Sequence, residues 1–187
     1  MVANICGRVS RIRPEVWNLG SAAEAGIPNV ILFAGSSLGM ATADPYLRAA
    51  IEQARKRLSE GGIPIGSVLV HEGKIIGRGH NCRVQTGSAI DHGEMNCLRN
   101  AGRLPAQIYR NSTIYSTLSP CPMCSGAIVL YKIPRVVVGE NRTFLGAEDY
   151  MRSQGVQVDV VQDEECIQMM TDFILANPAL WNEDIGV

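Results

Sequence analysis

From residue 44 onward, apolar runs of strand length alternate with amphipathic segments of helix length. The first helical segment begins at Asp44-Pro45, an N-cap followed by proline at the first helical position, and it ends at Gly61-Gly62. Two strand-like runs follow at 65–70 and 74–79, with the turn residues His71-Glu72-Gly73 between them. Two strands separated by so short a turn are predicted to pair as a hairpin.

The later strands are separated by helices rather than by tight turns. We expect strands at 113–117, 135–139 and 156–161, and helices at about 92–100, 121–131, 147–153 and 164–176. A hairpin is antiparallel, whereas strands joined through helices can run parallel. The chain is therefore predicted to be an α/β protein, a three-layer α-β-α sandwich around a mixed five-stranded sheet.

Apolar stripes on the first and last of these helices predict the faces that pack on the sheet. The first stripe holds Leu47, Ile51, Ala54 and Leu58. The second stripe holds Cys166, Met169, Met170, Phe173 and Asn177, and Pro178 is expected to end that helix.

Charge and composition limit the classes of partner. The chain has 187 residues, 46% of them hydrophobic, which suits one folded domain with a sizeable core. Its 17 Lys and Arg and 18 Asp and Glu residues give a formal net charge of −1, so no field favours a nucleic acid, and none is expected as a partner. No stretch reaches the roughly 20 apolar residues of a membrane helix, so no membrane partner is expected either.

The six cysteines are too sparse for a disulfide scaffold and are unevenly placed. Cys121 and Cys124 form a close pair, whereas the remaining four stand alone. This pattern is typical of metal-binding or catalytic thiols in a reducing compartment.

Two short motifs carry the chemistry: His92-Gly93-Glu94 and Pro120-Cys121-Pro122-Met123-Cys124. Catalytic zinc sites use three nitrogen or thiolate ligands and leave a fourth position for water. We predict that His92, Cys121 and Cys124 bind one zinc ion, and that Glu94 moves protons beside it. His-x-Glu followed by Pro-Cys-x-x-Cys is the known signature of zinc deaminases.

A Cys-x-x-Cys pair alone is more often a redox pair or half of a structural zinc site. A structural site also needs a fourth ligand, and His71 and His80 are available for that role. Neither histidine has a paired cysteine or histidine near it, so the two motifs together favour a catalytic site.

Five segments of the chain closely resemble the fungal, yeast-like type of cytosine deaminase, a branch of the cytidine deaminase superfamily. The resemblance covers about residues 44 to 187 and includes a C-terminal motif that other members of the superfamily lack. The segments are Gly77–Asn81, His92–Glu94, Ser116–Ile128, Val138–Asn141 and Trp181–Gly186.

The resemblance implies the cytidine deaminase fold and the hydrolytic deamination of free cytosine to uracil and ammonia, as in pyrimidine salvage. A zinc-activated hydroxide would attack C4, and Glu94 would shuttle protons to N3 and to the leaving amino group. The side chain of Asn81 and the backbone N–H of Gly93 would bind the C2 carbonyl, and the Ser119 carbonyl would accept from the amino group.

Asp184 matches the carboxylate that accepts the proton on ring N1, and Phe144 and Trp181 match aromatic residues that cover the base. Because N1 of a nucleoside carries the sugar, Asp184 would select free bases such as cytosine and 5-fluorocytosine. One departure is Asn182, which stands where the family usually has an aromatic residue and leaves the exact substrate open.

Two other enzyme classes remain open: a deaminase of guanine, a pterin or a modified pyrimidine, and a tRNA adenosine deaminase. A non-enzymatic zinc or dithiol module is a third alternative. The resemblance also implies a homodimer, with the helices after the two motifs at its interface.

Residues 1–40 are expected to be an N-terminal extension of uncertain role, and 41–187 the catalytic domain. The extension holds Arg8, Arg11 and Arg13 but only two acidic residues, which leaves open a transit peptide or a misplaced start before Met40. The free thiols and the lack of a clear secretory signal favour the cytoplasm, with the nucleus or an organelle as alternatives.

Overall fold

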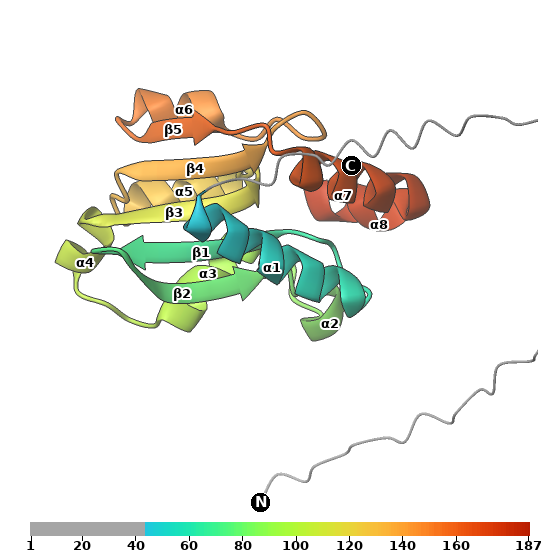
Figure 1. Ribbon diagram of the computed structural model, residues 1–187, viewed down its shortest axis with the longest axis horizontal. Helices are drawn as coiled ribbons and strands as arrows, with labels where there is room; N and C mark the ends of the chain where they lie inside the picture. The colour runs from blue at the N-terminus through green and yellow to red at the C-terminus, as the bar shows by residue number, and fades with distance from the viewer. Residues whose placement is uncertain (1–43) are drawn as a thin grey trace, which may run out of the picture. The chain divides into compact units, whose positions relative to one another are not determined.

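Five strands form one mixed sheet at the centre of the protein, in a computed structural model that describes residues 44–187 (Figure 1). The strand order is β2-β1-β3-β4-β5; β1 pairs antiparallel with β2 and β3, whereas β3, β4 and β5 are parallel. The strands are β1 Gly66–His71, β2 Lys74–His80, β3 Ser112–Leu118, β4 Arg135–Glu140 and β5 Gln157–Val160. The predicted mixed five-stranded sheet is confirmed. The expected extension at 1–40 lies outside the described residues.

Helices cover both faces of the sheet. The helices are α1 Pro45–Ser59, α2 Arg83–Thr86, α3 Gly93–Ala101, α4 Ala106–Arg110, α5 Pro122–Leu130, α6 Glu148–Ser153, α7 Glu164–Ala176 and α8 Pro178–Ile185. One buried cluster joins α1 and α7 to one face of the sheet, and a second joins α3, α4, α5 and α6 to the other. The predicted three-layer α-β-α sandwich is therefore confirmed.

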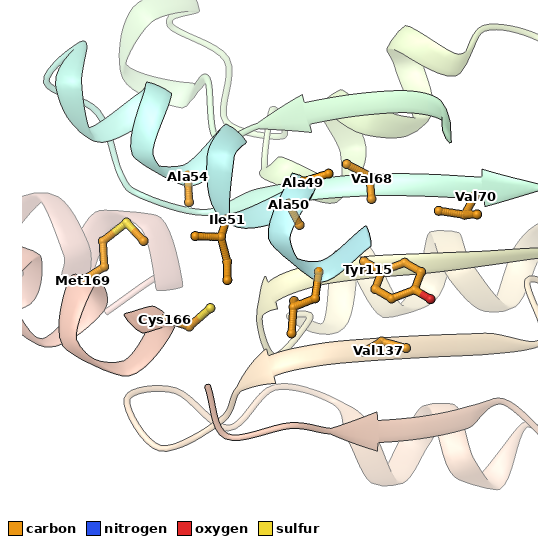
Figure 2. Packing of buried hydrophobic residues seen from close by; sticks show 11 residues of the cluster. Ala49, Ala50, Ile51, Ala54, Val68, Val70, Tyr115, Val137, Cys166 and Met169 are labelled. Carbon is orange, nitrogen blue, oxygen red and sulfur yellow. The ribbon is translucent and has the colours of Figure 1, made fainter. Parts of the chain in front are cut away.

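Helix α1 packs on the sheet through small and branched side chains (Figure 2). Asp44 caps it as expected, because its carboxylate accepts from the backbone N–H groups of Tyr46 and Leu47. The cluster beneath it comprises Leu47, Ala49, Ala50, Ile51, Ala54, Val68, Val70, Tyr115, Val137, Cys166 and Met169. This core fixes α1 and α7 over β1, β3 and β4.

Three details differ from the sequence-based expectation. Leu58 is 43% exposed, and Arg57 is buried in its place with a guanidinium nitrogen 3.1 Å from Cys82 Sγ. Asn177 is exposed at the end of α7 and does not continue the buried stripe. Pro178 ends α7 as expected, but it also begins α8, because proline is well tolerated at the first position of a helix.

No helix in the described part of the chain has both the length and the apolar character to span a membrane.

Helix α3 approaches β2 so closely that only glycine fits at the contact. A Cβ atom on Gly79 would lie 2.6 Å from the Cα of Cys97, and one on Gly77 would lie 2.8 Å from the carbonyl oxygen of Cys97. The backbone of α3, which carries His92 at its N-cap, is thereby held directly against the sheet.

We predict that Gly79→Ala destabilises the fold by about 3 kcal/mol, because the added methyl group meets backbone atoms that cannot rotate away. The matched control is Gly126→Ala in α5, where an added Cβ meets nothing within 4 Å. That change should leave stability equal or raise it by up to about 1 kcal/mol, since alanine favours a helix. Urea unfolding of both variants is the measurement, and equal stability of the two would contradict the tight contact.

Candidate active site

Two helices begin side by side at one end of the sheet, and their N-caps carry the motif residues. His92 caps α3 and Cys121 caps α5, with Pro122 at the first position of α5. His92 Nδ1 lies 3.5 Å from Cys121 Sγ, and the donor atoms of His92, Cys121 and Cys124 all lie within 4.8 Å of one another. The two motifs therefore meet in space, as predicted.

This donor set fits zinc. One imidazole nitrogen and two sulfurs are ligands that zinc prefers, and three protein ligands leave the fourth tetrahedral position open. Within residues 44–187 no other group of three or more His, Cys, Asp or Glu residues is arranged to hold a metal, so His71 and His80 supply no fourth ligand.

The electrostatics of the two thiols favour metal binding. The hydrogen bond with Cys124 lowers the pKa of Cys121 to about 4, against the opposing effect of burial, and the His92 ring adds to this. The start of α5 also stabilises negative charge, because its first backbone N–H groups have no helical partner. Both effects favour the thiolate form of Cys121, which is the form that binds zinc.

Glu94 lies in the first turn of α3, and its carboxyl group is buried beside the metal ligands. Its Oε1 accepts a 2.8 Å hydrogen bond from the hydroxyl of Ser116 on β3. Burial first, and then the nearby Cys121, raise the pKa of Glu94 above its ordinary value. A carboxyl group with a raised pKa holds a proton more tightly than an exposed one, which suits a group that must take up a proton and then release it.

Asp184 lines the site, and Asn81 is hydrogen-bonded to it. Asp184 lies on α8 and is 7% exposed, and Asn81 follows β2 and is 1% exposed. The side-chain amide of Asn81 donates a 2.9 Å hydrogen bond to Asp184 Oδ1, which also lies 3.9 Å from His92 Nε2. The C-terminal motif is therefore brought to the metal ligands by α8.

Ser119 lies between the end of β3 and the first thiol ligand, and a network of hydrogen bonds holds it in place. Its hydroxyl donates to the buried carboxylate of Glu148 at 2.8 Å and accepts from the backbone N–H of Gly146 at 3.0 Å. A side chain on Gly146 would bring a Cβ atom within 2.9 Å of the Ser119 carbonyl oxygen. The peptide at Ser119 is therefore fixed on both sides.

Two aromatic rings, Phe144 and Trp181, meet edge to face with their centroids 5.8 Å apart. The turn before Phe144 is held by Glu140, which is fully buried and accepts from the backbone N–H groups of Arg142 and Thr143 at 2.6 and 3.0 Å. Asn182 is exposed and is not among the residues that line the cavity.

Seven of the ten predicted site residues line one cavity. The other three lie next to the cavity lining. Asn81 is hydrogen-bonded to Asp184, and Cys124 is fully buried beside Cys121. Gly93 packs against Ile65 at the start of α3. The cavity is lined by Ile65, His92, Glu94, Leu118, Ser119, Cys121, Phe144, Trp181, Asp184 and Ile185.

Four residues that support this cavity were not found from the sequence. Ser116 donates a hydrogen bond to Glu94, and Glu148 accepts one from Ser119. Gly146 packs on the Ser119 peptide. Arg83 forms an ion pair with Asp184 at 3.1 Å. Ser116 carried a usable signal, because it is a polar residue at a predicted buried strand position. The other three carried none, because these partners lie 27 or more positions away in the chain.

Comparison with known proteins places this geometry in one family. The model of the cytidine and deoxycytidylate deaminase zinc-binding region matches residues 40–140, which is more than half of the chain. Cytosine deaminase of Candida albicans (strain SC5314 / ATCC MYA-2876) is 55% identical over 141 residues, 75% of this chain and 94% of that protein. The tRNA-specific adenosine deaminase of Bacillus subtilis (strain 168) is 37% identical over 138 residues, 68% of this chain and 86% of that protein.

A solved structure from a study of A-to-I editing by tRNA:A34 deaminases is similar with a TM-score of 0.57 and 27% identity. The alignment covers 66% of this chain and 97% of that one. The family model, these relatives and the His-Cys-Cys group agree. The chain belongs to the zinc-binding cytidine and deoxycytidylate deaminase family.

Proposed function

We propose that this protein hydrolyses free cytosine to uracil and ammonia. The observation that carries the proposal is Asp184, which α8 places in the same cavity as His92, Glu94 and Cys121. The similarity to the cytosine deaminase of Candida albicans supports it, because the alignment covers 94% of that protein.

Glu94 is the proton shuttle of the proposed reaction. Zinc held by His92, Cys121 and Cys124 would supply a hydroxide nucleophile at neutral pH. Glu94 takes a proton from the attacking water and delivers it to N3 of the base. It then takes the proton of the new hydroxyl group at C4 and delivers it to the C4 amino group, which leaves as ammonia while the C4 carbonyl of uracil forms. Atoms balance, because one water is consumed and one ammonia is released.

Polar groups around the cavity would orient the ring. The Asn81 amide and the Gly93 N–H donate to the carbonyl at C2, and the Ser119 carbonyl accepts from the amino group at C4. Asp184 accepts the proton on N1. These contacts match the hydrogen-bonding groups at N1, C2 and C4 of free cytosine.

The closed side of the cavity disfavours nucleosides and nucleic acids. A sugar on N1 would remove the proton that Asp184 accepts and would meet the buried Trp181, which packs against Phe144. A tRNA adenosine deaminase must admit a base that is attached to a long polymer. The Trp181 and Asp184 wall therefore supports the free-base assignment over the tRNA alternative.

The proposal extends to the assembly and the cellular role. A groove over α3, α4 and the end of α5 is lined mainly by apolar residues, together with Arg99 and Arg103. Tyr131 in this groove is 43% exposed, and Leu130, next to it in the chain, is 73% exposed. This surface suits a second copy of the chain, and it includes the helices after both motifs. We place the reaction in pyrimidine salvage in the cytoplasm, consistent with the five cysteines in the described residues, all of which are free thiols.

The dimer predicts that Leu130→Asp yields monomers at micromolar concentration, because a carboxylate would be buried at the interface. Leu175→Asp on α7 is the matched control, since Leu175 is equally exposed at 77% but lies outside this surface. Light scattering of both variants measures the mass. A monomeric parent protein, or a dimer that survives Leu130→Asp, would contradict the proposed interface.

Glu94→Gln should retain zinc and lose turnover by about 10²- to 10⁴-fold, because an amide cannot accept the proton of water. Zinc content by mass spectrometry and ammonia release measure the two effects separately. A variant that kept more than about a tenth of the parent activity would show that another group moves the protons.

Cytosine should be preferred over cytidine, deoxycytidine and 1-methylcytosine by at least about 10²-fold in kcat/KM. Each of these three lacks the N1 proton, so the Asp184 carboxylate would be buried against them without its partner. The panel also includes guanine, a pterin and a tRNA substrate. Comparable kcat/KM values for cytosine and 1-methylcytosine would contradict the assignment of a free base as substrate. Faster turnover of guanine, the pterin or tRNA would show that this compound, and not cytosine, is the substrate.

A further inference from the structure

Arg83, on the short helix α2, contacts both polar side chains of the base-binding wall. Its guanidinium Nη1 donates to Asp184 Oδ1 at 3.1 Å, and the side chains of Arg83 and Asp184 are 19% and 2% exposed. Its backbone N–H donates to Asn81 Oδ1 at 3.1 Å. One residue thus touches Asp184 through its side chain and Asn81 through its main chain.

The backbone contact determines which way the Asn81 amide points. Because Oδ1 of Asn81 accepts from Arg83, its Nδ2 is left as the donor on the other side, where it meets Asp184 Oδ1 at 2.9 Å. An Nδ2 group has two protons, so one remains for a substrate carbonyl.

The side-chain contact determines which oxygen of Asp184 is free. The hydrogen bonds and ion pairs that the described residues make with Asp184 all go to Oδ1, from Asn81, Arg83 and the more distant His92. A carboxylate has two oxygens and can accept at each. Oδ2 therefore remains available for a donor on the substrate.

The ion pair with Asp184 is the polar contact that the Arg83 guanidinium makes within the described residues. Its Nε is buried and has no hydrogen-bond partner in this part of the chain, which is unfavourable for a charged group. The pairing with Asp184 offsets part of the free-energy cost of burying the guanidinium. The contact also connects α2 to α8, two helices that are far apart in the sequence.

We propose that Arg83 is the positioning residue for base recognition. It holds Asp184 so that Oδ2 faces the ring N1–H, and it holds Asn81 so that Nδ2 faces the C2 carbonyl. This inference rests on the proposed function, because it assigns a role toward a free pyrimidine base. Arg83 is assigned a positioning role because it acts on the base through Asp184 and Asn81.

Arg83→Met tests the side-chain part of the role, because methionine keeps the apolar stem and removes the charge. We expect kcat/KM for cytosine to fall roughly 10- to 100-fold, the loss typical of one hydrogen bond to a charged group. The loss should appear mainly in KM, because the contact is made in both the ground state and the transition state. Zinc content should remain that of the parent protein.

Two further variants separate positioning from a merely structural effect. Arg83→Lys should recover most of the loss, because the observed ion pair uses a single nitrogen that an ammonium can replace. Arg135→Met is the matched control, since it removes an arginine–aspartate pair, to Asp159 at 2.7 Å, at the far end of β4. It should leave both kcat and KM unchanged.

A double-mutant cycle with Asp184→Asn shows whether Arg83 acts through Asp184. If it does, Arg83→Met should cost at most about twofold more in the Asp184→Asn background, since the two changes remove one shared contact. A full second loss in the double variant would overturn the inference, as would a loss confined to kcat or one that Lys fails to recover.

Binding of pyrimidin-2-one, a cytosine analogue without the amino group, gives a readout that needs no turnover. Measured by calorimetry, the Kd of pyrimidin-2-one should rise in Arg83→Met by the same factor as the KM for cytosine rises. Equal affinity in the parent and the variant would overturn the role of Arg83 alone. Absence of ammonia release from cytosine by the parent protein would instead overturn the proposed function.

Discussion

The imidazole of His92 and the thiol of Cys121 lie 3.5 Å apart because two helices begin at the same end of one sheet. Helix α3 reaches this position only because glycine at position 79 lets its backbone lie against β2. Helix α5 follows β3 directly. The arrangement provides two helix N-termini that stabilise thiolate charge and a buried Glu94 within the same few ångströms. Metal binding and the proposed proton transfer both depend on this close approach of the first turns of α3 and α5.

In the proposed function, selectivity for the base comes from a different part of the chain. Helix α8 adds Trp181 and Asp184 to a cavity whose other residues come from the sheet and its first helices. The bonds from Asn81 and Arg83 to Asp184 attach α8 to the segment after β2. The matching family model covers the zinc-binding region, whereas in the proposed function the wall formed by Trp181 and Asp184 decides which base can enter. A tRNA-specific adenosine deaminase is 37% identical over 138 residues, so similarity over much of the chain does not by itself determine the substrate.

Local signals in the sequence predicted the parts of the fold that depend on neighbouring residues. The Asp44 cap, the first hairpin and the two helix starts at His92 and Cys121 all follow from residues within a few positions of one another. The helix at α8 was missed because Pro178 signals both an end and a beginning, and its packing partners are remote. Arg83 was missed for the same reason, since its partner Asp184 lies about a hundred positions along the chain.

The central claim is that one cavity holds zinc and reads the N1 proton of a free base. A crystal structure of the zinc-loaded protein with pyrimidin-2-one, with zinc located by anomalous scattering, tests it most directly. The account predicts zinc at about 2.0–2.1 Å from His92 Nδ1 and about 2.3 Å from the sulfurs of Cys121 and Cys124. It also predicts Asp184 Oδ2 within hydrogen-bond distance of ring N1, beneath Phe144 and Trp181. Zinc on other ligands, or a ring bound with N1 away from Asp184, would contradict the account.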